Sequence, residues 1–582
     1  TPLGDGGPVV VDWPSAACQA QTASLLGKMS RLQKAGQMVS PVNPADSDVQ
    51  QNQYGSILSG GSNNPTSGNT PADWAAMTDS YLQDTVSGPL GIPEIYALDA
   101  VHGNSHPSGT VIFPHAIGLA SSRDANLVMQ VGQMTALESI ATGVTMTYAP
   151  QASVAWDARW GRFYETFSED VDWAAEMVAA EVIGLQGPMG LGSGNPGIIA
   201  CAKHWAGDGQ GTAGKSFLPN WAGVVDRSDI EVNQSDMEKY GMAAYVPAIQ
   251  AGLGCMMVSD TTWNGKFITS NSTMITTLLK GMYGFKGIVL TDWNANVNAG
   301  GVEPTINAGV DMLMEPDAPP AADSWQNAVQ TIANDTNIPD SRIDDAVTRI
   351  LNVKCQAGLF NFKRDPSLLA SVGSADHRAL ARKAVAQSLV VLQNNNKVLP
   401  LSKTAKIWIG GSGANNLSNQ CGGWTINWQG NGNATTGTTI QQAIGKVTNL
   451  AGDMNSADID IVVLSEPPYA ETPGDSQTIN TLPAADFTLL SQAKATGKPV
   501  VAIVISGRTV QIADNLANAD AWIAAWLPGT EGDGVADVLF GDVKPTGKLS
   551  HSWRKDDSQD NFMTCCNGNY QPLFPLGFGL TY

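Results

Sequence analysis

The chain has 582 residues, 43% of them hydrophobic and 15% charged, and its 32 basic and 53 acidic residues give a formal net charge of −21. This composition is typical of a globular protein of two or three domains and excludes a disordered chain. The negative charge argues against nucleic acid or an anionic membrane surface as a partner. No apolar run reaches the roughly 18 residues that a membrane-spanning helix needs, so we expect no membrane insertion.

Repeated strand and helix patterns occupy the first 315 residues. Amphipathic stretches at 124–143, 168–187 and 228–252, each closed by glycine, separate short apolar runs. Such βα units require a parallel sheet with right-handed crossovers, which favours a (β/α)8 TIM-like barrel. The sequence shows seven of the expected strands but does not place the eighth. The seven apolar runs are YGSILSGG, IPEIYALDA, TMTYAPQA, GIIACAKHW, GCMMVSD, GIVLTDW and DMLMEP.

A second α/β series follows a break in this pattern. The helix pattern of 344–360 gives way to a stretch rich in Pro, Gly, Ser and charge, a composition typical of a linker. Apolar runs AKIWIGG, DIDIVVLSEPPY, KPVVAIVISGR and ADAWIAAWLPG then indicate a smaller three-layer sandwich with a mostly parallel sheet. We therefore expect a barrel domain at 1–361, a linker at 362–376 and a sandwich domain at 377–582. No G-x-G-x-x-G follows these strands, which argues against dinucleotide binding.

The seven cysteines do not form a metal-binding pattern. No CxxC pair or Cys/His cluster has the spacing of metal ligands, so we expect no metal site. An odd number leaves at least one cysteine unpaired within the chain, and the disulfide pattern stays open. The cysteines are Cys18, Cys201, Cys255, Cys355, Cys421, Cys565 and Cys566.

Acids and bases follow the predicted barrel strands. In a barrel these strand ends share the C-terminal face, where catalytic groups gather, so the sequence predicts a polar site there. Carboxylates with Lys and His but no metal pattern suit several chemistries, among them glycoside hydrolysis, which needs two carboxyl groups. An aromatic side chain against the apolar face of a sugar would also help, and Trp293, Trp424 and Trp428 are candidates. The strand-end residues are Asp99, His102, Lys203, His204, Asp260, Asp292 and Glu315.

Eight segments in order along the chain resemble glycoside hydrolase family 3 β-glucosidases, in particular the two-domain exo-glucanase-like branch. This resemblance implies a (β/α)8 barrel followed by an (α/β)6 sandwich, and a retaining exo-acting β-glucosidase that needs no cofactor. It also implies a periplasmic or secreted location. The matching segments are LDAVHG, WDARWGRFYETFSED, AKHWAGDG, WNG at 263–265, GIVLTDW, CGGWTINWQG, SEPPYAETPGD and LFPLGFGLTY.

The resemblance also implies roles for individual residues. Asp292 matches the nucleophile and Glu471, in YAETPGD, matches the acid/base, whose pKa should be raised by burial or by Asp292. Glu466 ends the strand and is interpreted as a support for the loop. Residues matching those that hold the hydroxyls of the innermost sugar are Asp99, Arg162, Lys203 and His204. Trp293 and Trp428 match a pair of indoles that clamps the next sugar.

Other residues leave alternatives open. Asp260, where plant relatives carry an aromatic residue, either binds a hydroxyl or caps a turn, and His102 either orients Asp99 or is a turn histidine. We expect Asp208 to orient the Lys-His pair, Asp475 to organise the acid/base loop, and the acids Glu165, Glu169 and Asp170 to form a solvated face and a helix start.

Three rival functions remain from the sequence. A β-xylosidase of the same family differs only in sugar preference. An N-acetylglucosaminidase is disfavoured because KHWAGDGQGTAGKS lacks the second histidine of that branch. A non-catalytic sugar-binding homologue would be expected to lose Asp292 or Glu471, and both are present.

Overall fold

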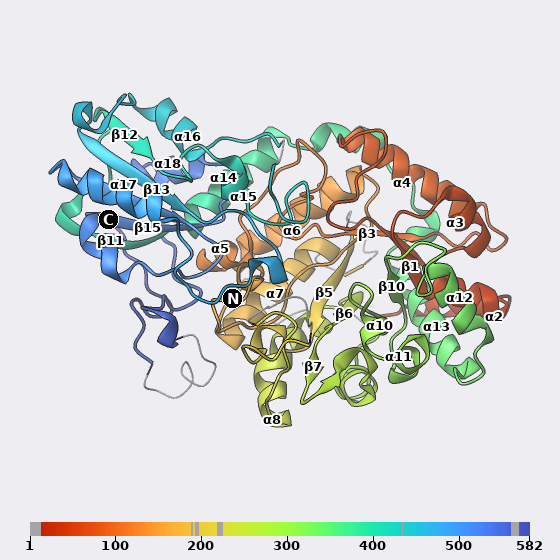
Figure 1. Ribbon diagram of the computed structural model, residues 1–582. Coiled ribbons are helices and arrows are strands. Elements are labelled where there is room, and N and C mark those ends of the chain that lie inside the picture. The colour runs from red at the N-terminus through yellow and green to blue at the C-terminus, as the bar shows by residue number, and fades with distance from the viewer. Residues whose placement is uncertain (1–12, 188–189, 192–196, 218–224, 433–434, 560–569) are drawn as a thin grey trace.

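The computed structural model describes residues 13–187, 190–191, 197–217, 225–432, 435–559 and 570–582. Two bodies are visible: a barrel formed by the first part of the chain, and a sheet covered by helices formed by the second (Figure 1). Cys565 and Cys566 lie outside the described residues. Among those described, no helix is long and apolar enough to cross a membrane.

The described part of the first domain contains a ring of eight parallel strands. β1 pairs with β10, and β2, β3, β4, β5, β6 and β9 pair in that order. Parallel bridges from Val42 to Leu58 and from Leu290 to Met312 join the two groups and close the ring. The strands are β1 (Val39–Pro41), β2 (Ser56–Leu58), β3 (Ile95–Leu98), β4 (Met146–Thr147), β5 (Ile199–Trp205), β6 (Cys255–Val258), β9 (Ile288–Leu290) and β10 (Leu313–Glu315).

The strand that the sequence did not place is β1. Its residues, Val39, Ser40 and Pro41, offer only one large apolar side chain, and the segment ends at a proline, so the pattern of a buried strand is weak. The other strands are buried apolar runs, as expected of a parallel sheet covered on both faces.

Helices surround the ring, and two of the long ones, α6 and α7, begin at an aspartate that caps the helix. Asp124 and Asp170 accept backbone N–H groups at the starts of α6 and α7. The helices of this domain are α1 (Ala16–Leu26), α2 (Arg31–Gln37), α3 (Asp46–Asn52), α4 (Pro71–Val86), α5 (Ala116–Ser121), α6 (Ala125–Ala141), α7 (Val171–Gln186), α8 (Gln234–Asp236), α9 (Val246–Gln250), α10 (Ala295–Asn298), α11 (Val302–Ala308), α12 (Trp325–Asn334) and α13 (Asp340–Gln356).

The amphipathic stretch at 228–252 does not form one regular helix. It is divided into α8, a π-helical segment at Met237–Met242, a 3-10 turn at Ala243–Tyr245, and α9. Pro247 lies in the first turn of α9, where its missing N–H is tolerated. A proline there cannot donate to a preceding helical turn, so a continuous α-helix through it is disfavoured.

The second domain is a sheet between helices. Its described strands run in the order β11-β15-β14-β13-β12, with β11 antiparallel and the rest parallel. The sequence predicted all of them except the edge strand β11. The strands are β11 (Val390–Asn394), β12 (Ile407–Gly410), β13 (Ile459–Ser465), β14 (Val500–Ile505) and β15 (Ala521–Trp526), and the helices are α14 (Ala375–Ser388), α15 (Leu417–Cys421), α16 (Ile440–Val447), α17 (Ala484–Ala495) and α18 (Asp533–Leu539).

The two domains share a packed interface. Barrel-domain side chains such as Ile117, Trp160 and Tyr164 belong to the same buried apolar cluster as the core of the sandwich. An apolar interface of this kind fixes the orientation of the domains, and hence the position of loops that cross from one to the other.

The described cysteines form two disulfides within the barrel domain, which join Cys18 to Cys355 and Cys201 to Cys255. Cys421 is buried and unpaired.

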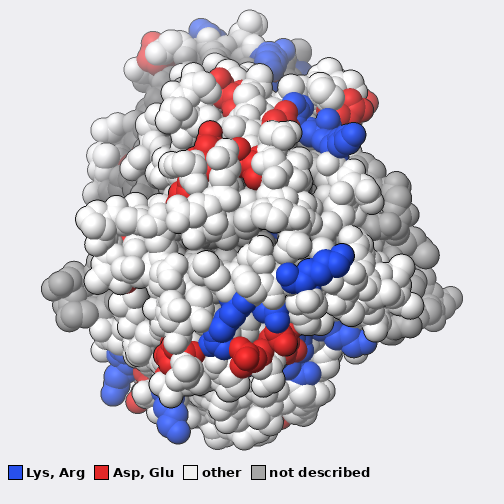
Figure 2. All heavy atoms as spheres, turned by 90° about the vertical axis from the view of Figure 1, so that its right-hand side faces the viewer, with Lys and Arg blue, Asp and Glu red and all other residues white. Residues whose placement is uncertain are grey.

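Charge is spread thinly over the surface. On the face seen in Figure 2, most atoms belong to uncharged residues, and the basic side chains among the described residues lie singly or beside acidic ones. This distribution agrees with the low content of charged residues. The described part of this face therefore carries no continuous basic patch.

Candidate active site

A cavity of about 340 Å³ lies between the C-terminal ends of the barrel strands and the loops of the sandwich domain. All the residues predicted to act in catalysis or to bind the sugar, except Asp260, line it. Its volume falls in the range of small-ligand sites. The other lining residues are Leu58, Gly61, Ser62, Asn63, Tyr148, Arg227, Met257 and Met314.

Asp292 reaches the cavity because strand β9 ends just before it, at Leu290. Its Oδ1 accepts the backbone N–H of Trp293 at 2.5 Å. Its Oδ2 lies 3.6 Å from Nε2 of His204, at the end of β5. The apolar strand therefore places a carboxylate among polar groups at the barrel rim, as the sequence predicted.

The imidazole of His204 is held by Asp208. Burial lowers the pKa of His204 well below its usual value, and Nδ1 lies 2.5 Å from Oδ2 of Asp208. Asp208 accepts a hydrogen bond from the Ser259 hydroxyl, and burial raises the pKa of Asp208 to about 6. Asp208 therefore contacts the histidine of the expected Lys-His pair, whereas Lys203 pairs with Asp99.

Lys203 and Asp99 form a buried ion pair at the cavity wall, with Nζ 2.8 Å from Oδ1. The Lys203 ammonium also lies 5.2 Å from the centre of the Trp424 ring, within cation–π range. His102 does not orient Asp99. Its ring nitrogens face the carbonyl oxygens of Phe113 and Trp424, so it fastens the Trp424 loop to the barrel.

Arg162 connects the two halves of the site. Its Nε and Nη2 each donate to Glu165 at 3.0 Å, and its Nη1 donates to Glu471 at 3.2 Å. The expectation that Glu165 lies on a solvated face is wrong, because its exposed fraction is only 4%. A buried guanidinium needs a paired carboxylate, and Glu165, which also accepts the Trp424 indole N–H, meets that need. The spacing of three residues between the pair was the available signal.

Glu471 lies on the loop after β13, and its side chain is 17% exposed. Burial raises its pKa to about 7, with Asp292 adding to the rise and Arg162 and Arg227 opposing it. The predicted raised pKa is thus confirmed. Glu466, by contrast, does not line the cavity: it pairs with Arg508 at 3.0 Å and accepts the Tyr469 hydroxyl. That supports its interpretation as a structural support.

The loop that carries Glu471 is clamped to the barrel by Asp475. Its carboxylate accepts the backbone N–H groups of Gly161 at 2.6 Å, Val225 at 3.0 Å and Asp226 at 2.8 Å. Thr472 donates its hydroxyl to Asp226 at 2.6 Å. The loop of one domain is thereby fixed to two segments of the other, and Asp475 organises it as expected.

Gly161 is the point of closest approach between the barrel and the Glu471 loop. A Cβ there would overlap the carbonyl oxygen of Glu471 and lie 2.7 Å from the backbone nitrogen of Asp475. We therefore expect Gly161→Ala to displace Glu471, the predicted acid/base, and to reduce kcat by about 100-fold, since shifts of about 1 Å have effects of that size. Gly452→Ala, where a Cβ meets nothing within 4 Å, is the control. Steady-state kinetics with an aryl glycoside measures both, and equal activities would show that this contact does not position Glu471.

Three indoles line the cavity. Trp293 is 41% exposed and Trp424 only 5%, because the Trp424 ring is packed against the ion pairs of the wall. A Cβ at Gly60 would lie 2.8 Å from the Trp293 ring, and a Cβ at Gly61 would lie 3.1 Å from Trp424 and Trp428. The glycines therefore leave room for the indoles.

Arg227 lines this cavity, and the predicted residue Asp260 lies beside it. Asp260 lines a much smaller one of about 10 Å³, which Asp292 and Arg227 also line. Its carboxylate accepts the Asn298 amide at 3.2 and 3.4 Å. Sequence reasoning missed Arg227, which follows no predicted strand. Glu315, at the end of β10, lines neither cavity and instead accepts the Asn296 amide at 3.0 Å.

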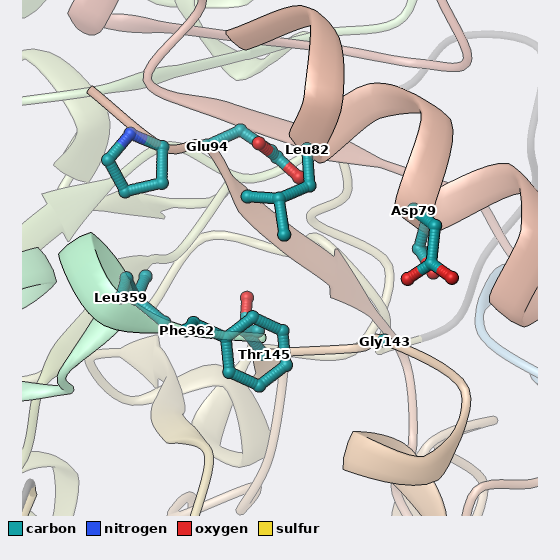
Figure 3. Close-up of a pocket in the computed structure, with 9 residues that line it drawn as sticks. Asp79, Leu82, Glu94, Gly143, Thr145, Leu359 and Phe362 are labelled. Carbon is teal, nitrogen blue, oxygen red and sulfur yellow. The ribbon is translucent and has the colours of Figure 1, made fainter. Parts of the chain in front are cut away.

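Two other hollows contain none of the predicted site residues. One of about 450 Å³ lies between the start of α7 and Leu576. Another, of about 10 Å³, is shown in Figure 3, where Glu94, Leu82 and Phe362 surround it. That volume holds one water molecule and no sugar. Among the described residues, no group of three or more His, Cys, Asp or Glu is arranged to bind a metal.

The chain matches the family model "Glycosyl hydrolase family 3 N terminal domain" over residues 30–353 and the model "Glycosyl hydrolase family 3 C-terminal domain" over 389–582. It is 29% identical to a periplasmic beta-glucosidase of Salmonella typhimurium, covering 97% of this chain and 80% of the relative. It is 27% identical to a beta-xylosidase of Formosa agariphila, covering 85% and 75%.

Among solved structures, the exo-1,3/1,4-beta-glucanase of a Pseudoalteromonas species superposes with a TM-score of 0.91 at 34% identity, covering 99% of this chain and 76% of that one. Two family models, one for each domain, and this likeness agree with the barrel and sandwich described above. The chain belongs to glycosyl hydrolase family 3.

Proposed function

We propose that the protein is a retaining, exo-acting β-glucosidase that releases glucose from the non-reducing end of β-glucosides and short β-glucans. The observation that carries this proposal is the placement of Asp292 and Glu471, one from each domain, in a single cavity. Glu471 has its pKa raised to about 7, as a general acid requires. The names of the glucosidase and glucanase relatives support glucose as the sugar.

The reaction proceeds by double displacement. Asp292 attacks the anomeric carbon while the carboxyl proton of Glu471 passes to the glycosidic oxygen, so the aglycone leaves as an alcohol. Water then attacks the glycosyl–Asp292 ester, Glu471 takes its proton, and glucose is released with the β configuration. Glu471 regains its proton in the second step, so the same two carboxyl groups are ready for the next substrate.

The walls of the cavity suit one terminal sugar. We assign the hydroxyl contacts to Asp99, Arg162, Lys203 and His204, all of which line the cavity. Met257, Met314 and Tyr148 also line it, and we place them against the apolar parts of the sugar. A cavity of this limited size favours removal of end residues over cleavage within a chain.

The next sugar would lie between indoles. Trp293 and Trp428 both line the cavity, and Trp293 is the more exposed. Stacking on a ring face is less directional than hydrogen bonding, so such a clamp accepts glucosides of different linkage. Trp424 forms part of the inner wall.

The rate should fall as the pH rises through about 7. Glu471 must carry a proton to act as an acid, and its pKa is raised to about 7. The pH dependence of kcat/KM reports the free enzyme, so we expect its alkaline limb to have an apparent pKa near 7. A limb that lies above pH 9 would remove Glu471 from this role.

A β-xylosidase is the second candidate, because one relative carries that name. Matched 4-nitrophenyl β-glucoside and β-xyloside separate the two through their kcat/KM ratio, since they differ only in the hydroxymethyl group. NMR of the first product tests the mechanism: β-glucose before mutarotation supports retention, and α-glucose contradicts it.

We infer a periplasmic or secreted location, supported by a relative named as periplasmic. The test is the distribution of glucosidase activity among medium, osmotic-shock fluid and lysed cells of the source organism. Activity confined to the lysed cells would contradict it.

A further inference from the structure

Arg227 has no role in the reaction as written, yet its guanidinium lines the cavity beside the acid/base. Nη2 lies 4.0 Å from Oε2 of Glu471, and Nε lies 3.8 Å from Oδ2 of Asp260. Its side chain is about one quarter exposed. The other oxygen of Glu471 accepts from Arg162, so the two arginines approach the two oxygens of one carboxylate.

The turn that carries Arg227 is fixed from both domains. Arg227 has a φ of +52°, in a tight turn where the Ser228 N–H donates to the Val225 carbonyl at 3.1 Å. Asp475 of the sandwich domain accepts the N–H groups of the two preceding residues. On the other side, Thr261 donates its hydroxyl to the Ser228 carbonyl at 2.6 Å. The turn therefore delivers Arg227 to the same loop that carries Glu471.

Asp260 faces Arg227 from the end of β6. It is 3% exposed, and a buried carboxylate requires partners. Those partners are Asn298, which donates to both oxygens, and Arg227. Asp260 is not among the residues that line the large cavity.

We propose that Arg227 is a positioning residue that holds the Glu471 carboxylate for proton transfer, and that Asp260 and Asn298 hold Arg227 in place. This inference rests on the proposed acid/base role of Glu471. It gives Asp260 a task other than contact with a sugar hydroxyl. The Asp260 carboxylate partly offsets the positive charge of Arg227. Glu471 can then keep a proton in the first step and lose it in the second.

The sign of the effect follows from the charges around Glu471. A nearby cation favours the ionised carboxylate, so removing Arg227 makes the proton harder to lose. Burial raises the pKa of Asp260 to about 7, so Asp260 gains its charge on the alkaline limb. Removing that charge leaves Arg227 to act on Glu471 alone, which makes the proton easier to lose. The charged groups that act on Glu471 are Arg162, Arg227, Asp226 and Asp292, and those that act on Asp260 are Arg227, Asp208 and Asp292.

The test is the pH profile of kcat/KM for an aryl β-glucoside with a poor leaving group. We expect the alkaline limb to move up by about one pH unit in Arg227→Met and down in Asp260→Asn. In the double variant the Asp260 effect should disappear, because it acts through Arg227. Arg227→Lys, which keeps the charge, should restore most of the wild-type profile. Lys215→Met, an exposed cation of the same loop that pairs with Glu231, is the control and should change nothing.

Three outcomes would overturn the inference. The first is an unchanged limb in Arg227→Met. The second is that the effects of Arg227→Met and Asp260→Asn add in the double variant. The third is an Asp260→Asn variant that raises KM with the limb unmoved. The last would mean that Asp260 binds a hydroxyl. Thermal unfolding of each variant confirms that the fold is kept. A wild-type enzyme inactive on the glucoside would refute the proposed function instead, so the two failures are distinguishable.

Discussion

Asp292→Asn is expected to lose at least about 10⁴-fold in kcat/KM toward aryl β-glucosides, because an amide cannot form the glycosyl ester that divides the reaction into two steps. The change keeps the size of the side chain and the hydrogen bond from the Trp293 N–H. The loss should therefore appear in kcat, while glucose still binds.

Asp323→Asn is the matched control, since Asp323 is exposed and lines neither cavity of the site. Steady-state kinetics and a glucose titration together give the result. An Asp292→Asn variant with more than a tenth of the wild-type activity would show that another group is the nucleophile.

Glu471→Ala should affect substrates according to their leaving groups. With a poor leaving group the first step needs the acid, and kcat/KM should fall by about 10²- to 10⁴-fold. With 2,4-dinitrophenyl β-glucoside, which leaves without a proton, kcat/KM should change little and the second step should become limiting. Azide, which needs no base, should then raise kcat and give β-glucosyl azide.

Glu466→Ala serves as the comparison for this experiment. Glu466 is buried against Arg508 and Tyr469, so its loss should lower stability and affect good and poor leaving groups alike. A dependence on leaving group and an azide effect in Glu466→Ala, with neither in Glu471→Ala, would reverse the assignment of the acid/base.

Much of the fold was predictable because buried strands leave strong signals. Runs such as IVL at β9 and VVAIVI at β14 are apolar throughout, and parallel strands with both faces covered require this. Strand β1 escaped prediction because the three residues of VSP carry too little of that pattern. Strand β11 lies at an edge with Gln393 and Asn394 half-buried, so its run is short.

The site was predictable where a side chain follows a strand, and less so where it lies on a loop. Asp292, Lys203 and His204 come directly from strand ends. Arg227 reaches the cavity only through a turn that Asp475, some 250 residues later, holds by hydrogen bonds. Sequence spacing says nothing of such a contact.

The burial of Glu165 was predicted wrongly. Glu165 precedes a helix start in sequence, which is typical of a solvated acid, but the buried Arg162 requires it as a partner. Arg162 also donates to Glu471, so Glu165 helps to position the residues of the site.

The central claim is that Asp292 forms a covalent glycosyl-enzyme. It is tested most directly by incubating the protein with an activated 2-deoxy-2-fluoro-β-glucoside, followed by mass spectrometry and peptide mapping, because the fluorine slows breakdown of the intermediate. We predict one adduct per chain, located on Asp292. An adduct on a different carboxylate, or no adduct with either the glucoside or the corresponding xyloside reagent, would contradict the account.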